Sequence, residues 1–298
     1  MSDFAGANNT ELRQPFSSRI DVDIFGMSDQ GYVRENNEDH YLVIRGSRVL
    51  QTVFGNLTGN RPGQLYEETG FGFIVADGLG GESAGEVASR QAIFGLLNLA
   101  LLTADWQFKW GLKEMNTVKW RMQDRFRRVN EDLVQRSMAN EDLSGMATTM
   151  TAALSYGKDL IIGHIGDSRA YLLHQGQLSR LTRDHTLAEH LDDGNDPVRL
   201  DALRNVLVQV LGGSDPECAP DVDEYVLEDT DQLMLCTDGL TDMVEDSAIE
   251  SVLLKEDSAQ SACRSLVDLA LANGGVDNIT VIIARYSMPP LNDAELEY

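Results

Sequence analysis

The feature that most constrains this chain is a set of five short Asp-bearing segments, at residues 34–39, 76–81, 165–169, 236–241 and 275–278. Three of them follow apolar runs, so that Asp77, Asp167 and Asp238 each stand at the end of such a run. Short apolar runs closed by glycine are typical of buried strands that end in tight turns. Carboxylates at such ends, without a matching set of His or Cys, favour hard cations such as Mg²⁺ or Mn²⁺ over zinc.

A single Asp-Gly pair is ordinarily a turn and nothing more. Here Asp77-Gly78 is followed by a glycine-rich stretch that becomes a helix pattern, instead of by the second strand of a hairpin. Glycine lets the backbone approach closely, so the Gly78 carbonyl could also face a metal.

Seven segments occur in the order 26–39, 75–81, 145–149, 166–171, 181–185, 235–241 and 277–280. Together they resemble the type 2C family of metal-dependent protein serine/threonine phosphatases, in its bacterial form. The resemblance runs from about residue 21 to residue 286, which is nearly the whole chain.

The resemblance implies that Asp77 bridges two metal ions, Mn²⁺ or Mg²⁺, with the Gly78 carbonyl on one of them. Asp238 and Asp277 would complete the first metal, and these three aspartates would form the catalytic centre. Leu79 stands where animal members carry a His proposed as general acid, so a water would protonate the leaving group.

The resemblance further implies that Glu38 and Asp39 hold the second metal, directly or through water, and that Arg34 binds the substrate phosphate. Asp167 would form a third metal site together with Asp238. Two readings stay open: Asp39 could instead cap or pair near Arg34, and the 167–169 segment could be a turn with an internal ion pair.

Neighbouring polar residues are expected to be structural: Asn278 should orient Asp277 or its loop, and Ser168, Thr148 and Thr149 should be structural hydroxyls. The resemblance also implies that residues 184–212, which include His185 and His190, form a flap beside the site, and this flap is expected to select substrates. Both histidines are expected at the surface or as caps. Residues 45–69 are expected to contain an extended surface loop, and Trp106, Trp110 and Trp120 to pack together.

The pattern of apolar residues predicts an α+β fold, namely a four-layer αββα sandwich of two antiparallel sheets flanked by helix pairs. Strands are expected at about 20–27, 39–45, 71–76, 150–156, 160–165, 169–174, 222–227, 232–237 and 279–285, and helices at about 83–103, 116–138, 246–254 and 258–273. One phosphatase domain should span 19–287, between flexible tails at 1–18 and 288–298.

The net charge is −24 and the pI is about 4.4. Such an acidic chain is a poor partner for nucleic acid or an anionic membrane. Its three cysteines have no metal-like spacing, and their odd number suits a reducing cytoplasm. The stretch 92–103 is too short to cross a membrane, and a monomer is expected.

We therefore expect a Mn²⁺- or Mg²⁺-dependent phosphatase that acts on phosphoserine or phosphothreonine in proteins and opposes a Ser/Thr kinase. One alternative is a catalytically weak module of the same fold that binds phosphoproteins. A third reading is a small-molecule phosphoesterase. Asp77, Asp238 and Asp277 are all present, which speaks against the binding module, because a pseudo-enzyme usually loses one of them.

Overall fold

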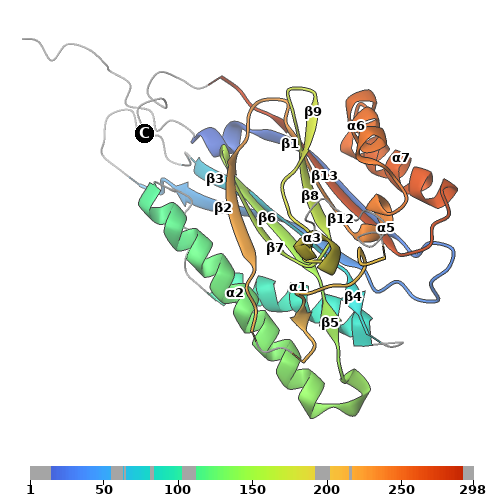
Figure 1. Cartoon of the computed structure of the whole chain (residues 1–298). Coiled ribbons are helices and arrows are strands. Elements are labelled where there is room, and N and C mark those ends of the chain that lie inside the picture. The colour runs from blue at the N-terminus through green and yellow to red at the C-terminus, as the bar shows by residue number, and fades with distance from the viewer. Residues whose placement is uncertain are drawn as a thin grey trace, which may run out of the picture.

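The computed structural model describes residues 15–54, 63, 65–80, 84–102, 112–191, 202–214 and 217–290, with the side chains of 112–115 left out. Within these residues the strands form two five-stranded antiparallel sheets and a small third sheet (Figure 1). The first sheet has the order β1 (Asp21–Asp29), β13 (Ile279–Ser287), β12 (Gln232–Cys236), β8 (Arg169–His174) and β9 (Gln177–Arg180). The second has the order β11 (Asp221–Val226), β7 (Asp159–Ile165), β6 (Met150–Tyr156), β3 (Leu65–Ala76) and β2 (His40–Gln51).

Helices cover the outer face of each large sheet. The second sheet packs against α1 (Ala84–Leu102) and α2 (Leu112–Ala139), and the first packs against α6 (Asp246–Lys255) and α7 (Ala259–Ala272). The small sheet joins β10 (Leu211–Gly212), β5 (Ala147–Thr148) and β4 (Gly78–Leu79), and the shorter helical elements are η1 (Phe16–Arg19), η2 (Glu141–Leu143), α3 (Leu187–Leu191) and α5 (Asp238–Thr241). The predicted four-layer sandwich is confirmed.

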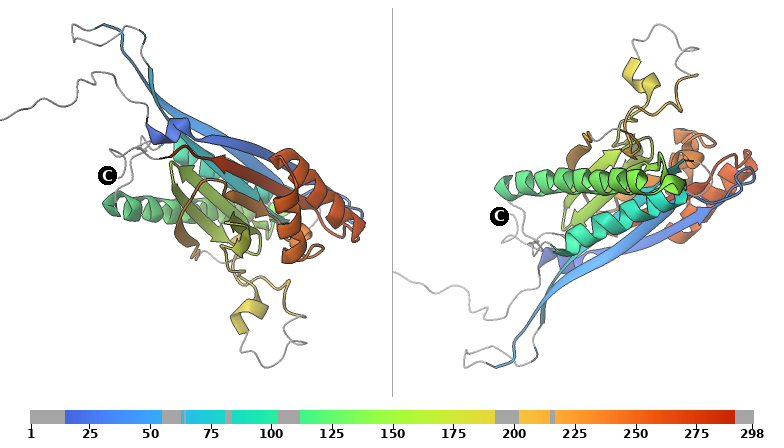
Figure 2. Two further views of the ribbon diagram at one scale, coloured as in Figure 1. Left: turned by 90° about the horizontal axis from the view of Figure 1, so that it is seen from above. Right: turned by 90° about the horizontal axis from the view of Figure 1, so that it is seen from below.

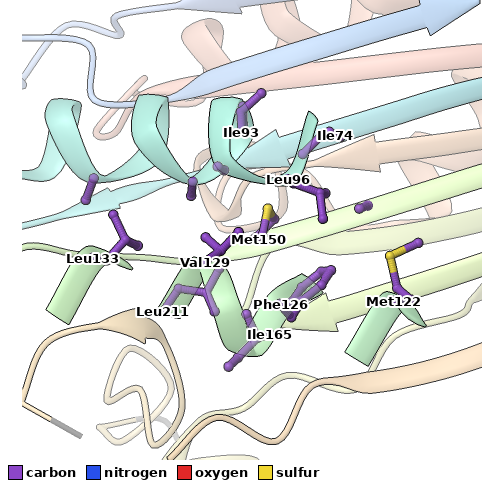
Figure 3. Packing of buried hydrophobic residues seen from close by; sticks show 14 of the residues in the cluster. Ile74, Ile93, Leu96, Met122, Phe126, Val129, Leu133, Met150, Ile165 and Leu211 are labelled. Atoms are coloured by element: carbon purple, nitrogen blue, oxygen red, sulfur yellow. The ribbon is translucent and has the colours of Figure 1, made fainter. Parts of the chain in front are cut away.

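Three apolar cores hold the four layers together. On β3, Phe73 belongs to the core between the two sheets, whereas the next residue, Ile74, belongs to the core under α1 and α2. This alternation follows from the two-residue period of a strand. Figure 3 shows the outer core, where Phe126 and Val129 of α2 lie against Ile165 and Met150 of the sheet.

The stretch 45–69 differs from the expected surface loop. β2 and β3 pair continuously from His40↔Ala76 to Gln51↔Leu65, so both sides of this stretch are hairpin arms. β3 meets β6 only from Gly70 onward, and the arms therefore continue past the sheet as a two-stranded ribbon (Figure 2). The glycines and proline that suggested a loop fall mostly in residues 55–62, outside the described part.

Both expected tails contain ordered residues where they join the domain. Ser17 in η1 is buried and its hydroxyl accepts a hydrogen bond from the Thr69 amide, and Met288 is also buried. Trp120 on α2 was expected to pack but is 62% exposed, whereas Trp106 and Trp110 lie outside the described residues. No helix among those described has the length and hydropathy needed to span a membrane.

Candidate active site

One cavity of about 350 Å³ gathers the segments that stood apart in the sequence. It lies where β3 and β12 end and where β13 begins, beside the loop between β1 and β2. Seven of the eight predicted site residues line it: Arg34, Glu38, Asp77, Gly78, Asp167, Asp238 and Asp277. The eighth, Asp39, does not line the cavity.

Asp39 is buried, with 5% of its surface exposed. Its Oδ2 accepts a 2.8 Å hydrogen bond from the Thr237 hydroxyl, which in turn accepts one from the Thr280 amide. Arg34 pairs with Asp277 and not with Asp39, so the alternative of an Asp39–Arg34 pair is not observed. Direct or water-mediated metal binding by Asp39 stays a prediction.

Two threonines fix Asp77 at the end of β3. The Thr149 hydroxyl accepts a hydrogen bond from the Asp77 amide at 3.0 Å, and the Thr149 amide donates to the Asp77 carbonyl at 2.9 Å. The Thr148 hydroxyl donates to the same carbonyl at 2.7 Å. The backbone of Asp77 is thus held on both sides, and the expected structural role of these hydroxyls is confirmed.

Two glycines allow backbones to meet beneath the site. A Cβ atom on Gly78 would lie 2.2 Å from the Gly85 carbonyl oxygen of α1, and one on Gly239 would lie 2.0 Å from the Asn278 carbonyl oxygen. Real Cβ atoms do not approach backbone so closely, and any larger residue would push Asp77 or Asp238 away from its neighbours.

Asn278 holds the loop that carries Arg34 and Glu38. Its buried side chain accepts a hydrogen bond from the Glu38 amide at 2.8 Å and donates to the carbonyls of Gln30 (2.8 Å) and Asn36 (2.9 Å). The Glu38 carbonyl also accepts from the Ser89 hydroxyl of α1 at 2.6 Å. Asn278 was expected to orient Asp277 or its own loop; its backbone amide does donate to Asp277 Oδ1 at 2.8 Å, but its side chain positions the loop of Arg34 and Glu38 instead.

Arg34 reaches across the site to the Asp277 carboxylate, with Nη2 and Oδ2 2.5 Å apart. Among the described residues no three His, Cys, Asp or Glu side chains stand arranged as a ready-made ligand set. The ion pair gives one reason, because it turns an expected ligand toward the guanidinium.

The residues nevertheless fit a divalent cation. Among the residues that the structure describes, Oδ1 of Asp39 and Oδ1 of Asp238 are buried and accept no hydrogen bond. Burial, and then the charges of Asp39 and Asp238, raises the pKa of Asp77 well above its ordinary value. Burial and the Asp242 carboxylate raise the pKa of Asp238 to about 6. Crowded oxygen donors that resist ionisation without a counter-charge are the donor set that Mg²⁺ or Mn²⁺ prefers.

Asp167 follows Gly166 at the end of β7 and is 8% exposed, facing the same cavity. Burial, with the Asp238 charge next, raises its pKa to about 8. The internal ion pair considered for this turn is absent, because Arg169 forms a two-pronged pair with Asp184 (2.7 and 3.0 Å). The metal role of Asp167 stays a prediction.

Three features escaped the sequence reasoning. Asn205 and Leu207 of the predicted flap line the cavity, although no motif marks them. His185 was expected at the surface or as a cap, but only 8% of its surface is exposed and its ring contacts Gly166. Its place in the 181–185 motif was the available signal.

Comparison with known proteins agrees with this geometry. The family profile described as Protein phosphatase 2C matches residues 67–265. The chain belongs to the protein phosphatase 2C family. It is 32% identical over 267 residues to the serine/threonine phosphatase stp of Listeria welshimeri, covering 88% of this chain and 94% of that protein.

Solved members of the family share the fold. The Mycobacterium tuberculosis serine/threonine phosphatase PstP/Ppp superposes with a TM-score of 0.70 at 31% identity, covering 89% of this chain and 99% of that one. The catalytic domain of PstP in complex with two manganese ions gives a TM-score of 0.69 at 30% identity, covering 90% and 99%.

Proposed function

We propose that this enzyme of the protein phosphatase 2C family hydrolyses phosphoserine and phosphothreonine in proteins with the help of Mn²⁺ or Mg²⁺. One observation carries the proposal: Asp77, Asp238, Asp277 and Arg34 converge on one cavity from four separate parts of the chain. The names of the Listeria and Mycobacterium relatives and the two manganese ions of PstP support it.

The carboxylates of Asp77, Asp238 and Asp277, with Glu38 and the Gly78 carbonyl, would hold two ions, and Asp167 a third. When bound, such ions supply an activated water and offset the charge of the phosphoryl group. The threonine and glycine contacts described above keep the ligands in place without any change of fold. Asp39 would help Glu38 to hold the second ion, directly or through water, while the Thr237 hydroxyl fixes its Oδ2.

Arg34 is suited to the phosphate because a guanidinium pairs with two oxygens at once. Its side chain is 57% exposed and sits at the cavity, so an arriving phosphoryl group can reach it. Its partner Asp277 would turn to the metal when the ions bind, and the guanidinium would then be available to the substrate.

Replacing Arg34 by Ala should raise KM for a phosphopeptide by about one to two decades, because a hydrogen bond to a charged group is worth about 1.5–3 kcal/mol. Steady-state kinetics at saturating Mn²⁺ measures this change. Arg34→Lys keeps the charge but loses the fork, and should fall between the two. An unchanged KM in Arg34→Ala would place the phosphate elsewhere.

The metal-free protein should become less stable as the pH rises from about 5 to 8. The folded-state pKa values of Asp238 (about 6) and Asp39 (about 7) lie above the ordinary 3.8, so the folded state holds extra protons below them. The stability that these extra protons give the folded state is complete near pH 4 and is lost as the pH rises through 6–7.

Thermal unfolding with a chelator or with excess Mn²⁺ tests this sign. We expect Tm of the chelated protein to fall by several degrees between pH 5 and pH 8, and Mn²⁺ to restore more of it at the higher pH. A chelated protein that gains stability over that interval would contradict the assignment of these buried carboxylates.

For the cell we propose a cytoplasmic, monomeric enzyme that opposes a Ser/Thr kinase in signalling. Cys236 and Cys263 are buried thiols that form no disulfide, which supports a reducing compartment. We infer that residues 19–287 form the catalytic domain with a flap at 184–212. Turnover of a phosphopeptide against p-nitrophenyl phosphate, with Mn²⁺ or Mg²⁺ added, tests the substrate class and separates it from a binding module or a small-molecule esterase.

A further inference from the structure

His185 and Gly166 are joined by a reciprocal pair of hydrogen bonds. The His185 amide donates to the Gly166 carbonyl at 2.7 Å, and the Gly166 amide donates to Nδ1 of the His185 ring at 3.3 Å. Gly166 immediately precedes Asp167 and has φ +107°, and a Cβ there would lie 2.6 Å from Thr149. The turn that carries Asp167 thus depends on glycine for its shape and on His185 for its amide.

The His185 ring is held so that Nδ1 can accept. Nε2 lies 3.1 Å from Oδ2 of Asp221 on β11, so the proton resides on Nε2 and Nδ1 carries the lone pair. The ring is buried and lies beside that of His164, with the centroids 4.9 Å apart. This arrangement fixes one tautomer and one orientation.

His185 stands near the start of the flap, and its backbone also reaches the flap segment at residues 205–208. Its carbonyl accepts a hydrogen bond from the Val208 amide at 2.8 Å, and Thr186 forms a bridge with Leu207. Leu207 and Asn205 line the active-site cavity together with Asp167. His185 is therefore bonded to the Asp167 turn on one side and to the cavity-lining flap segment on the other.

We propose that His185, oriented by Asp221, is a positioning residue that keeps the Asp167 carboxylate directed into the active-site cavity and ties this turn to the 205–208 segment of the flap. It touches neither substrate nor metal. The inference rests on the proposed function for the meaning of the site, but its effect on the Asp167 carboxylate can be measured by metal binding alone.

Two amide replacements separate positioning from simple packing. Asn at position 185 places Oδ1 near the position of Nδ1 and can still accept from the Gly166 amide. His185→Gln fills the space of the ring better, but its side-chain amide lies toward Asp221 and does not accept from the Gly166 amide. Mn²⁺ titration of the metal-free protein by calorimetry is the readout, and the site weakened in Asp167→Ala defines the one to follow.

We expect His185→Gln to weaken that Mn²⁺ site about tenfold or more, as is typical when a group that orients a ligand is lost. His185→Asn should weaken it less than about threefold, and the exposed change Asp221→Ala by an intermediate factor. The amide of Val208 should exchange faster in His185→Gln than in His185→Asn. The matched controls are His174→Asn and His174→Gln, since His174 also bonds a carboxylate, Asp231, but at the β8–β9 turn.

Equal effects of Asn and Gln, or a milder effect of Gln, would overturn the proposal, because His185 would then only fill space. If neither variant folds, Asp221→Ala decides alone, and an unchanged Mn²⁺ site there counts against the proposal. If the wild-type protein binds Mn²⁺ with the expected contrast between variants but does not turn over phosphopeptides, the proposed function fails and the positioning role stands.

Discussion

Asp238→Asn is expected to lower turnover by about a thousandfold while leaving the protein folded. A neutral amide is a poor ligand for a hard cation, and the metal contribution at stake is several kcal/mol of barrier. Asp238 is also the residue that the proposed two-ion and third-ion sites share. Steady-state turnover of a phosphopeptide, with Mn²⁺ titrated to saturation, measures the loss.

The stability of the same variant separates lost chemistry from lost structure. The pKa of Asp238 is raised to about 6, so its charge is unfavourable in the metal-free protein at pH 8. Removing that charge should leave the metal-free Tm equal or higher, and should reduce the rise in Tm that Mn²⁺ produces. Asp257→Asn, an exposed change between α6 and α7, serves as control. More than about a tenth of the wild-type rate in Asp238→Asn would refute the ligand assignment.

Asn278→Ala is expected to damage both stability and catalysis. The change leaves the Glu38 amide and the carbonyls of Gln30 and Asn36 without their partner. At about 1 kcal/mol for each hydrogen bond, Tm should fall by about 5–10 °C. Arg34 and Glu38 sit on the released loop, and a misplacement of about 1 Å can cost about 100-fold in rate.

A matched control is Asn273→Ala at the end of α7, where the exposed side chain donates one hydrogen bond to the Met243 carbonyl at 2.7 Å. It should change Tm by less than about 2 °C and leave turnover unaltered. Should Asn278→Ala lose stability but keep its rate, the loop would be held by other contacts, such as those of Gln30 with the carbonyls of Arg34 and Glu35.

The sequence by itself determined the layers and most of the site. Strand periodicity located the two sheets, and Asp77 and Asp238 could be placed because an Asp-Gly turn after an apolar run is a local signal. Gly78 was expected on the same grounds to let backbones approach closely, and its close contact with the Gly85 carbonyl agrees. These features depend on neighbours a few residues away, which is why a single sequence reveals them.

The tertiary structure alone decided what depends on distant pairs. Asp39 lies under the cavity because Thr237, 198 positions away, donates to it, and Arg34 meets Asp277 across 243 positions. His185 became buried because Gly166 and Asp221 approach it from two different strands. No local propensity encodes such hydrogen bonds and ion pairs, since they form only after distant strands have paired and the two sheets have packed and brought the loop ends together.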